Sequence, residues 1–343
     1  MNTTMVNSSD VTCVPFSKED PVSAKAIKAT SYIVIMLFAL LGNAAVIAIV
    51  SKNKHMRTTT NYLIANMAVS DMLLSAFAMP RELTQIFVGY QGWLIDGLSG
   101  ATLCKVVYFF QEISTAVSIQ SIVVITLDRY TGVVQPFREP IVTPKRRKFV
   151  IALIWLISMG LHGIYFYIAR LQKVNGVHIC SFSFEPAFDN LRALRIHFII
   201  VSVVLIAIPM TFITVLYSRI FKALRSQEPF WKSCSSSLMK SRREENTKIT
   251  KKILAIIFLF VICILPIDIM GFFFFFLWYK KIPCGMDQLS FAAKFIFYSN
   301  TSLNPCVYFL LNERYRRALR HLLKGCKRFS QERDMEMLRV QFK

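Results

Sequence analysis

The chain has 343 residues, of which 54% are hydrophobic and only 18% are charged, and its mean hydropathy is +0.46. So few charged side chains cannot cover the surface of soluble domains of this total length, so we expect a protein embedded in a membrane. The formal net charge of +21 is compatible with a nucleic-acid partner or with a membrane surface, and the position of the charges along the chain distinguishes these classes.

Seven apolar segments follow one another along the chain. A helix rises about 1.5 Å per residue, so roughly 20 apolar residues cross a hydrocarbon core of about 30 Å. The segments are apolar on all sides and lack the alternation of barrel strands, so they predict an all-α, seven-transmembrane helix bundle. They are Thr30–Ser51, Asn61–Pro80, Val106–Val134, Phe149–Ala169, Ile196–Tyr217, Ile253–Tyr279 and Leu289–Leu311.

Basic residues gather in four regions between and after these segments. About 28 of the 41 Lys and Arg follow the first, third, fifth and seventh segments, and cytoplasmic loops of membrane proteins carry such an excess. The sequence therefore predicts an N-terminus outside and a C-terminus in the cytoplasm. The charges lie in short loops rather than on a folded module, which argues against a nucleic-acid partner. The expected divisions are 1–29, an extracellular N-terminus; 30–311, the transmembrane domain; 312–325, a short amphipathic helix; and 326–343, a cytoplasmic tail.

The predicted outer N-terminus contains two Asn-x-Ser/Thr triplets, at Asn2 and Asn7, which are acceptors for glycosylation. The stretch before the first segment has no apolar core. We therefore expect the first segment to act as a signal anchor, without a cleavable signal peptide.

The eight cysteines are scattered singly, without a Cys-x-x-Cys pair, which argues against zinc knuckles and thioredoxin-like chemistry. Cys104 and Cys180 both fall on the predicted outer side, in an oxidising compartment where disulfides persist. Cys13 and Cys284 also fall outside, either as a second bridge or as free or differently paired thiols. Cys326 follows the last segment beside basic residues, which suits palmitoylation, with a reduced thiol as the alternative.

Polar side chains within the apolar segments are expected to mark function, because each is costly in hydrocarbon unless it has a partner. Asp71 is the one charged residue of the second segment, and neutral oxygen donors occur near the middle or inner half of other segments. This set predicts an Na⁺ or proton site, with a helix-to-helix hydrogen-bond network as the alternative. Its members are Asn43, Asp71, Ser118, Asn300, Thr301 and Asn304.

Short motifs occur in the order and in the segments typical of one protein family. In chain order they are Gly42-Asn43, Ala68-Val69-Ser70-Asp71, Cys104, Asp128-Arg129-Tyr130, Trp155, Pro209 with Tyr217, Phe260 with Cys263 and Pro266, and Asn304-Pro305-Cys306-Val307-Tyr308. Through them the chain resembles the rhodopsin-like (class A) G-protein-coupled receptors over nearly its whole length.

The resemblance implies a plasma-membrane receptor that activates heterotrimeric G proteins and binds arrestin. It implies neither an enzyme nor a cofactor beyond the Na⁺ considered above, and no catalytic cluster occurs among the five histidines. It also implies a disulfide between Cys104 and Cys180.

The activation residues of the family have counterparts in this chain. The resemblance implies that Asp128 holds Arg129 at rest and that Arg129 turns toward the G protein when active, with Pro136 and Phe137 as further contacts. Tyr217 and Tyr308 are expected to meet through water. The prolines at 209, 266 and 305 are expected to kink their helices. The expected switch residues are Asp128, Arg129, Tyr130, Tyr217, Phe260, Pro266, Asn304, Pro305 and Tyr308, with Pro209 as the third kink.

Two departures affect the expected mechanism. Ile264 stands where the family usually has a tryptophan, so we do not carry over the relay through that side chain. The second acid that usually restrains the arginine falls on Asn246, with Glu245 one residue early. A weakened restraint and a higher basal activity are therefore a hypothesis.

The ligand class is inferred from replaced residues. Gln111 stands where amine receptors have an aspartate, and Tyr298 where opsins have the retinal lysine. A glutamine at position 111 is common among neuropeptide-type receptors, which implies a peptide. Nearby acids predict pairing with a basic group on that peptide, or internal pairing of Glu112 and Asp268 with Arg81, His197 or Lys294. A small cationic or lipid ligand, or a constitutively active receptor, is the alternative. The expected ligand-binding residues are Glu82, Gln111, Glu112, Asp268, Lys294 and Tyr298.

The predicted cytoplasmic side offers two further features. After Leu311, apolar residues recur at helical spacing among arginines, which predicts an amphipathic helix lying on membrane lipid. Serines cluster between residues 233 and 241, so phosphorylation that recruits arrestin is expected there.

Overall fold

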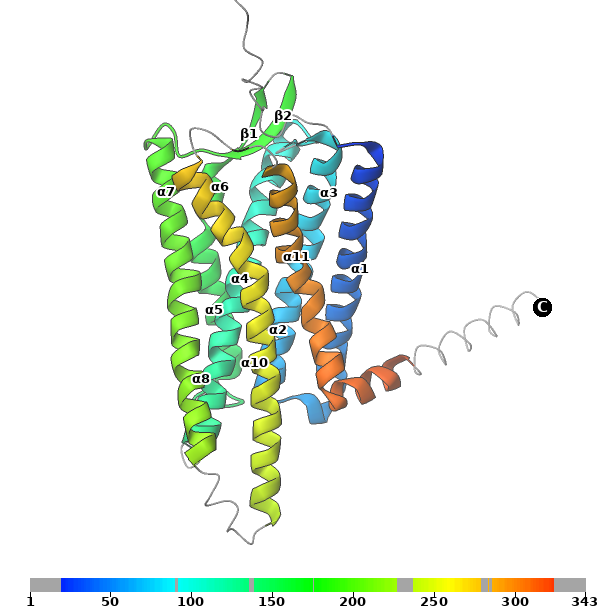
Figure 1. Cartoon of the computed structure of the whole chain (residues 1–343), viewed down its shortest axis with the longest axis vertical. Coiled ribbons are helices and arrows are strands. Elements are labelled where there is room, and N and C mark those ends of the chain that lie inside the picture. Colours follow the sequence, from blue (N-terminus) through cyan, green and yellow to red (C-terminus); the bar gives the residue numbers. More distant parts are fainter. Residues whose placement is uncertain are drawn as a thin grey trace, which may run out of the picture.

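The structure is a computed structural model that describes residues 20–89, 92–135, 139–174, 176–226, 237–278, 283 and 286–323, with residues 226 and 237–246 described by their backbone alone. Long helices run side by side, and a short β-hairpin covers one end of the bundle (Figure 1). We call this the hairpin end, and the opposite end, where α1 and α11 finish, the basic end.

The first half of the bundle contains three membrane-length rods. The second rod is continuous although it has a π turn, because α2, η2 and α3 follow one another without a break. The elements are α1 (Val22–Lys52), the 3-10 turn η1 (Lys54–Met56), α2 (Thr59–Leu73), the π turn η2 (Leu74–Ala78), α3 (Met79–Val88) and α4 (Gly97–Val134). The last is central, since it packs against α2, α5, α8 and α10.

The second half adds four rods and the hairpin. The elements are α5 (Arg147–His162), α6 (Tyr165–Ile168), β1 (Ala169–Val174), β2 (Val177–Phe182), α7 (Asn190–Val201), the π turn η3 (Ser202–Ala207), α8 (Ile208–Ser226), α10 (Ser237–Phe272), the π turn η4 (Phe273–Leu277) and α11 (Met286–Leu311). A further helix over residues 313–323 leaves the bundle at the basic end (Figure 1).

Within the described residues, six helical stretches are long and apolar enough to cross a membrane: Val22–Lys52, Thr59–Val88, Gly97–Val134, Arg147–Ile168, Asn190–Arg225 and Thr247–Leu277. The seventh rod, α11, is 26 residues long and packs between α1 and α10. It is less apolar because it contributes Asn300, Thr301 and Asn304 to the interior, where they are buried. The predicted seven-helix bundle is confirmed.

The helix limits predicted from hydropathy were too short at the hairpin end. The first, third and fifth rods begin at Val22, Gly97 and Asn190, ahead of the expected limits, so the boundary at residue 30 falls inside α1. Hydropathy identifies only the part of a helix that lies in hydrocarbon, whereas polar turns continue it. At the fifth rod such a turn has a cap, because the Asp189 carboxylate accepts from Arg192 N–H at 2.8 Å.

The β-hairpin is the one described element that the all-α prediction missed. Its antiparallel strands place Val174 opposite Val177, and Gly176 between them has a φ of +84°. The sequence signal for this hairpin is the Asn-Gly pair at 175–176, which stands between two valines. The expected disulfide is present: Cys180 of β2 is bonded to Cys104 of α4, with Cα atoms 5.8 Å apart.

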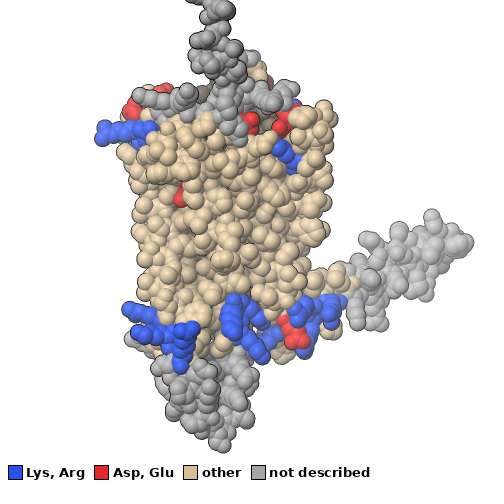
Figure 2. Space-filling model, viewed as in Figure 1, with Lys and Arg blue, Asp and Glu red and all other residues tan. Residues whose placement is uncertain are grey.

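Charged side chains occupy the two ends of the molecule. Figure 2 shows Lys and Arg gathered at the basic end, both acidic and basic side chains at the hairpin end, and a broad band between them with almost no charge. The middle band carries exposed apolar side chains, such as Phe38, Leu41 and Phe258, each more than 60% exposed. In water such a surface would drive aggregation, so it marks the lipid-facing belt.

Candidate functional site

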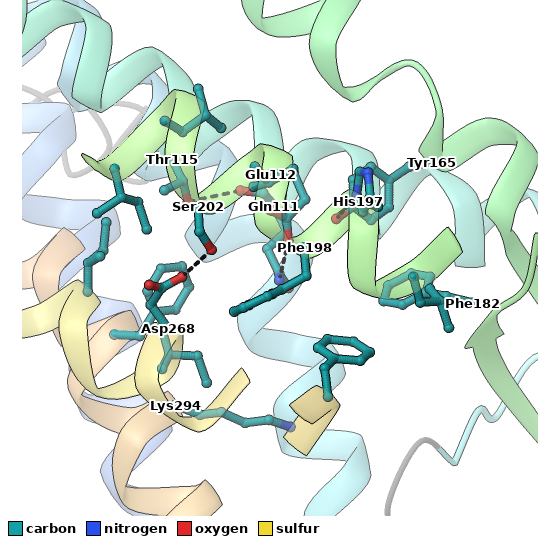
Figure 3. A pocket seen from close by; sticks show the side chains of 18 of the residues that line it. Gln111, Glu112, Thr115, Tyr165, Phe182, His197, Phe198, Ser202, Asp268 and Lys294 are labelled. Carbon is teal, nitrogen blue, oxygen red and sulfur yellow. Dashed lines mark hydrogen bonds between the residues drawn. The ribbon is translucent and has the colours of Figure 1, made fainter. Parts of the chain in front are cut away.

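A cavity of about 270 Å³ lies in the hairpin half of the bundle. Side chains from α4, α7, η3, α10 and α11 line it, and Tyr165 and Phe182 close it toward the hairpin (Figure 3). Its wall combines aromatic rings, aliphatic groups and charged groups of both signs. Five of the six predicted ligand-binding residues line it, namely Gln111, Glu112, Asp268, Lys294 and Tyr298.

Glu82, the sixth, lies behind the wall and is used internally. Lys294 Nζ donates to Glu82 Oε2 at 3.0 Å, and the guanidinium of Arg81 forms an ion pair with Glu82 Oε1. Arg81 also donates to Tyr298 at 3.2 Å and stacks over the Tyr108 ring, 4.3 Å from its centroid. Two cations thus surround one buried carboxylate, which leaves Glu82 no free face for a ligand.

The two remaining acids have neutral partners. Gln111 Nε2 donates to Glu112 Oε1 at 3.1 Å, while Gln111 Oε1 accepts from the Tyr298 hydroxyl at 3.0 Å. On the other side of the cavity, Ser202 Oγ donates to Asp268 Oδ1 at 2.8 Å (Figure 3). The internal pairing considered as an alternative for Glu112 and Asp268 is not seen within the described residues, because Arg81 and Lys294 pair with Glu82 instead.

A polar core continues below the cavity. Asn304 Nδ2 donates to Asp71 Oδ2 at 2.9 Å, and Asn43 Nδ2 donates to the Thr301 carbonyl at 2.9 Å. Ser118 contacts Ser70 at 3.0 Å. The side-chain oxygens of Asn43 and Asn300 are buried without a partner among the described residues.

This core has the chemistry of a small hard-cation site. One carboxylate lies in a core of hydroxyl and amide side chains, whose oxygens are the kind of ligand that alkali and alkaline-earth ions prefer. The orphan oxygen of Asn300 also fits, since a buried acceptor without a donor is costly and a cation would satisfy it. The residues present are therefore suited to Na⁺.

Comparison with known proteins decides the family. The family model described as "7 transmembrane receptor (rhodopsin family)" matches residues 42–308, which is most of the chain. The chain belongs to the rhodopsin family of seven-transmembrane, G-protein-coupled receptors. It is accordingly a receptor and not an enzyme.

Several peptide-named receptors are similar to this receptor. It is 28% identical over 309 residues to a QRFP-like peptide receptor of Branchiostoma floridae, covering 88% of this chain and 78% of the relative. It is 29% identical over 305 residues to the substance-K receptor of Mus musculus, covering 88% and 76%. The neuromedin-U receptor 2 of Rattus norvegicus is 26% identical over 304 residues, covering 85% and 74%.

At the basic end the receptor holds its Asp-Arg-Tyr arginine by two contacts. Arg129 Nη2 donates to Asp128 Oδ2 at 2.5 Å and to Thr60 Oγ1 at 3.1 Å, while Thr60 Oγ1 donates to Asp128 at 3.1 Å. Because Thr60 belongs to α2, the arginine is tied to a neighbouring helix as well as to its own. The threonine was not predicted, since nothing in the sequence pairs it with a residue 69 positions away.

The helix over residues 313–323 is amphipathic as predicted; it begins one residue after the expected start at 312, and the described chain ends at 323. Tyr315 is fully buried and stacks on Tyr308 with ring centroids 5.9 Å apart. Arg317 donates to Glu313 at 2.9 Å and lowers the pKa of that exposed carboxyl. The apolar side of the helix is anchored on the bundle, and its arginines face outward.

The two tyrosines expected to meet through water lie inside the bundle. The hydroxyls of Tyr217 and Tyr308 are buried and make no well-formed hydrogen bond within the described chain. Phe260 is buried, and Ile264 lies one turn beyond it at the cavity wall. The aliphatic side chain at position 264 cannot hydrogen-bond to a ligand.

Several residues that line the cavity were not predicted as ligand-binding residues. A polar residue in an apolar segment does not indicate which neighbouring helix its side chain faces. Two signals in the sequence could have indicated them: Ser202 and His197 are polar residues of the predicted fifth segment, and Arg81 is next to Glu82. Other predictions fall outside the described residues or their described side chains: Asn2, Asn7, Cys13, Pro136, Phe137, Asn246, Cys284, Cys326 and the serine cluster.

Proposed function

We propose that this receptor binds an extracellular peptide in the cavity at its hairpin end and activates a heterotrimeric G protein at its basic end. The observation that carries the proposal is the cavity itself, whose wall offers aromatic surface, amide and hydroxyl groups, and charges of both signs. Peptides present this mixture of groups, whereas a lipid needs few charges. The peptide names of the relatives support the same ligand class.

The test is a ligand screen in cells that express the full-length receptor. Synthetic secreted peptides are applied beside biogenic amines and lipids, and second messengers are recorded against vector-only cells. A saturable response to a peptide is the expected result. A response to amines alone would favour the small cationic ligand, for which Asp268 offers a carboxylate, and would contradict the peptide proposal.

We infer that the hairpin end faces outside and that the receptor sits in the plasma membrane with a cytoplasmic C-terminus. The disulfide at the hairpin end is of a kind that persists in oxidising compartments. The Lys and Arg at the opposite end follow the rule for cytoplasmic loops (Figure 2).

The basic end is proposed as the surface for the intracellular partners. Release of Arg129 from Asp128 and Thr60 would expose a guanidinium to the G protein, and the family resemblance implies Pro136 and Phe137 as further contacts. The arginines of the helix over residues 313–323 would bind anionic lipid, at about 1 kcal/mol for each residue near the surface. Arrestin is proposed to bind after phosphorylation of the serines between residues 233 and 241.

We also propose Na⁺ as a ligand of the polar core. Asp71 would supply the charge, and oxygens of Ser118, Asn300, Thr301 and Asn304 would supply neutral ligands. A cation there would neutralise the buried carboxylate and favour the packing in which α2, α4 and α11 surround it.

A further inference from the structure

Three acids were candidates to recognise a basic group of the ligand, and their surroundings differ. Glu82 is 4% exposed and has Arg81 and Lys294 as ion-pair partners. A ligand cation would have to displace one of these cations from a buried carboxylate. That exchange gains nothing, because one buried ion pair replaces another.

Glu112 forms no ion pair within the described residues, but it lies beside the group in which Arg81 and Lys294 hold Glu82. It accepts from the Gln111 amide at 3.1 Å, and the positive charge of Arg81 acts on it from the same side of the cavity. The four charges of Arg81, Lys294, Glu82 and Glu112 sum to zero. This side of the cavity is therefore a neutral group of charges, in which Glu82 is the carboxylate that forms the ion pairs.

Asp268 is different. It lies on α10 two residues after Pro266 and lines the cavity, where Figure 3 shows its carboxylate beside Ser202. Its hydrogen-bond donor is the neutral hydroxyl of Ser202, at 2.8 Å, and no Lys, Arg or His within the described residues forms an ion pair with it. A carboxylate has about four acceptor positions, and the serine uses one of them.

We propose that Asp268 is the counter-ion for a guanidinium or ammonium group of the ligand, and that Ser202 is the positioning residue that orients its carboxylate. The inference rests on the proposed function and defines its ligand: a molecule with a cationic side chain or amino group. Ser202 belongs to the π turn η3, and Asp268 follows the proline of α10, so this bond joins two irregular turns of neighbouring helices. A hydroxyl fixed there restricts the rotation of the carboxylate at the cavity wall.

The cation can be tested with a matched pair of small probes, before any peptide is known. Nα-acetyl-arginine amide carries a guanidinium, and Nα-acetyl-citrulline amide is its neutral isostere. Each is titrated to millimolar concentration into the purified full-length receptor in nanodiscs, and the Tm is recorded. We expect a saturable rise in Tm with the arginine probe and none with the citrulline probe, because binding to the folded state alone raises stability.

Substitutions assign the effect to one acid. Asp268→Asn keeps an acceptor for Ser202 but removes the charge, and we expect it to weaken the arginine probe at least tenfold. Glu112→Gln should leave the titration within about twofold of the wild type, since that charge is already compensated. Asp96 is exposed at the hairpin end, and its side chain makes no capping hydrogen bond, so Asp96→Asn is the matched control for net charge.

Ser202 is tested by conservative rescue. Ser202→Ala should weaken the arginine probe several-fold while the citrulline probe stays inactive, and Ser202→Thr, which keeps the hydroxyl, should restore it. A merely structural role would instead lower the Tm without probe and leave the probe titration unchanged. Should Asp268→Asn fail to fold, Asp268→Glu keeps the charge and should still discriminate between the two probes.

The inference is overturned if the arginine probe does not stabilise the wild type, if it stabilises Asp268→Asn equally, or if Glu112→Gln abolishes its effect. Its failure is separable from that of the proposed function. A receptor that responds to a peptide whose basic groups can all be replaced by neutral isosteres without loss of potency would refute the cation site alone. Probe binding at Asp268 without any peptide response would refute the peptide alone.

Discussion

At the scale of single residues, the same residue type has different roles because its neighbours differ. Glu82 and Asp268 are both carboxylates near the cavity, yet the first lies between two cations and the second accepts from a hydroxyl. The distinction is invisible in the sequence, where both are isolated acids at the edge or inside of an apolar segment. It decides which of them a ligand can reach.

Thr60 provides a residue-scale prediction for basal signalling. Thr60→Ala removes one of the two contacts that hold Arg129, so we expect basal G-protein turnover to rise about fivefold, which corresponds to the roughly 1 kcal/mol of a hydrogen bond. Nucleotide exchange in membranes without ligand measures it. Thr60→Ser keeps the hydroxyl and should behave as the wild type, and unchanged exchange in Thr60→Ala would refute the restraint.

Asp71 provides the prediction for the proposed Na⁺ site. The Tm of the purified receptor should rise with NaCl relative to choline chloride at equal ionic strength, because a cation bound only to the folded state stabilises it. Asp71→Asn removes the charge but keeps an oxygen for Asn304, and it should abolish the difference. A sodium effect of equal size in the variant would exclude Asp71 as the ligand.

At the scale of elements, close approach of helices depends on small residues that hydropathy does not distinguish. A Cβ at Gly42 would lie 2.7 Å from the Pro305 ring, so α1 can approach α11 at its internal proline only because position 42 lacks a side chain. The motif glycine and the motif proline, far apart in sequence, are two sides of one contact.

Gly42→Ala should therefore destabilise the receptor. We expect a loss of about 1–3 kcal/mol from overpacking, seen as a lower Tm. The matched control is Gly160→Ala in α5, where nothing lies within 4 Å of the added methyl group and the helix gains roughly 0.5–1 kcal/mol. Equal Tm values for the two variants would contradict the contact.

Tyr315 tests how the helix over residues 313–323 is held. The side chain is fully buried against Tyr308, so Tyr315→Ala should cost about 3–5 kcal/mol of packing and release the helix. Hydrogen exchange in the purified receptor measures it as faster exchange of residues 313–323. Leu323→Ala, at a position 53% exposed, is the control, and equal protection in both variants would refute the anchoring role.

At the scale of the whole molecule, charge and apolar surface together indicate how the bundle sits in a membrane. The exposed apolar band separates a basic end from a hairpin end that contains a disulfide (Figure 2). Neither feature alone assigns a side, but the positive-inside rule and the oxidising requirement of the disulfide agree.

Epitope tags at the two termini test that orientation. In intact cells an antibody should reach a tag before Met1 and should reach a tag after Lys343 only once the cells are permeabilised. A tag after Lys343 that stains intact cells would reverse the proposed topology and, with it, the assignment of the cavity to an extracellular ligand.

The sequence by itself determined the class of this protein. Runs of about 20 apolar residues have no stable alternative to membrane helices, and the ordered motifs from Gly42 to Tyr308 identified the family. The Asn-Gly pair at 175–176 also allows the hairpin to be predicted from the sequence. Local composition and spacing suffice for such features because they depend on neighbours in the chain.

Only the tertiary structure decided which charges cancel and which remain. Glu82 and Lys294 are 212 positions apart, and Ser202 and Asp268 are 66 apart. Their pairing depends on how helices rotate and pack, which hydropathy leaves undetermined because every face of these segments is apolar. The buried polar groups settle the pairing, since each must find a partner across a helix interface.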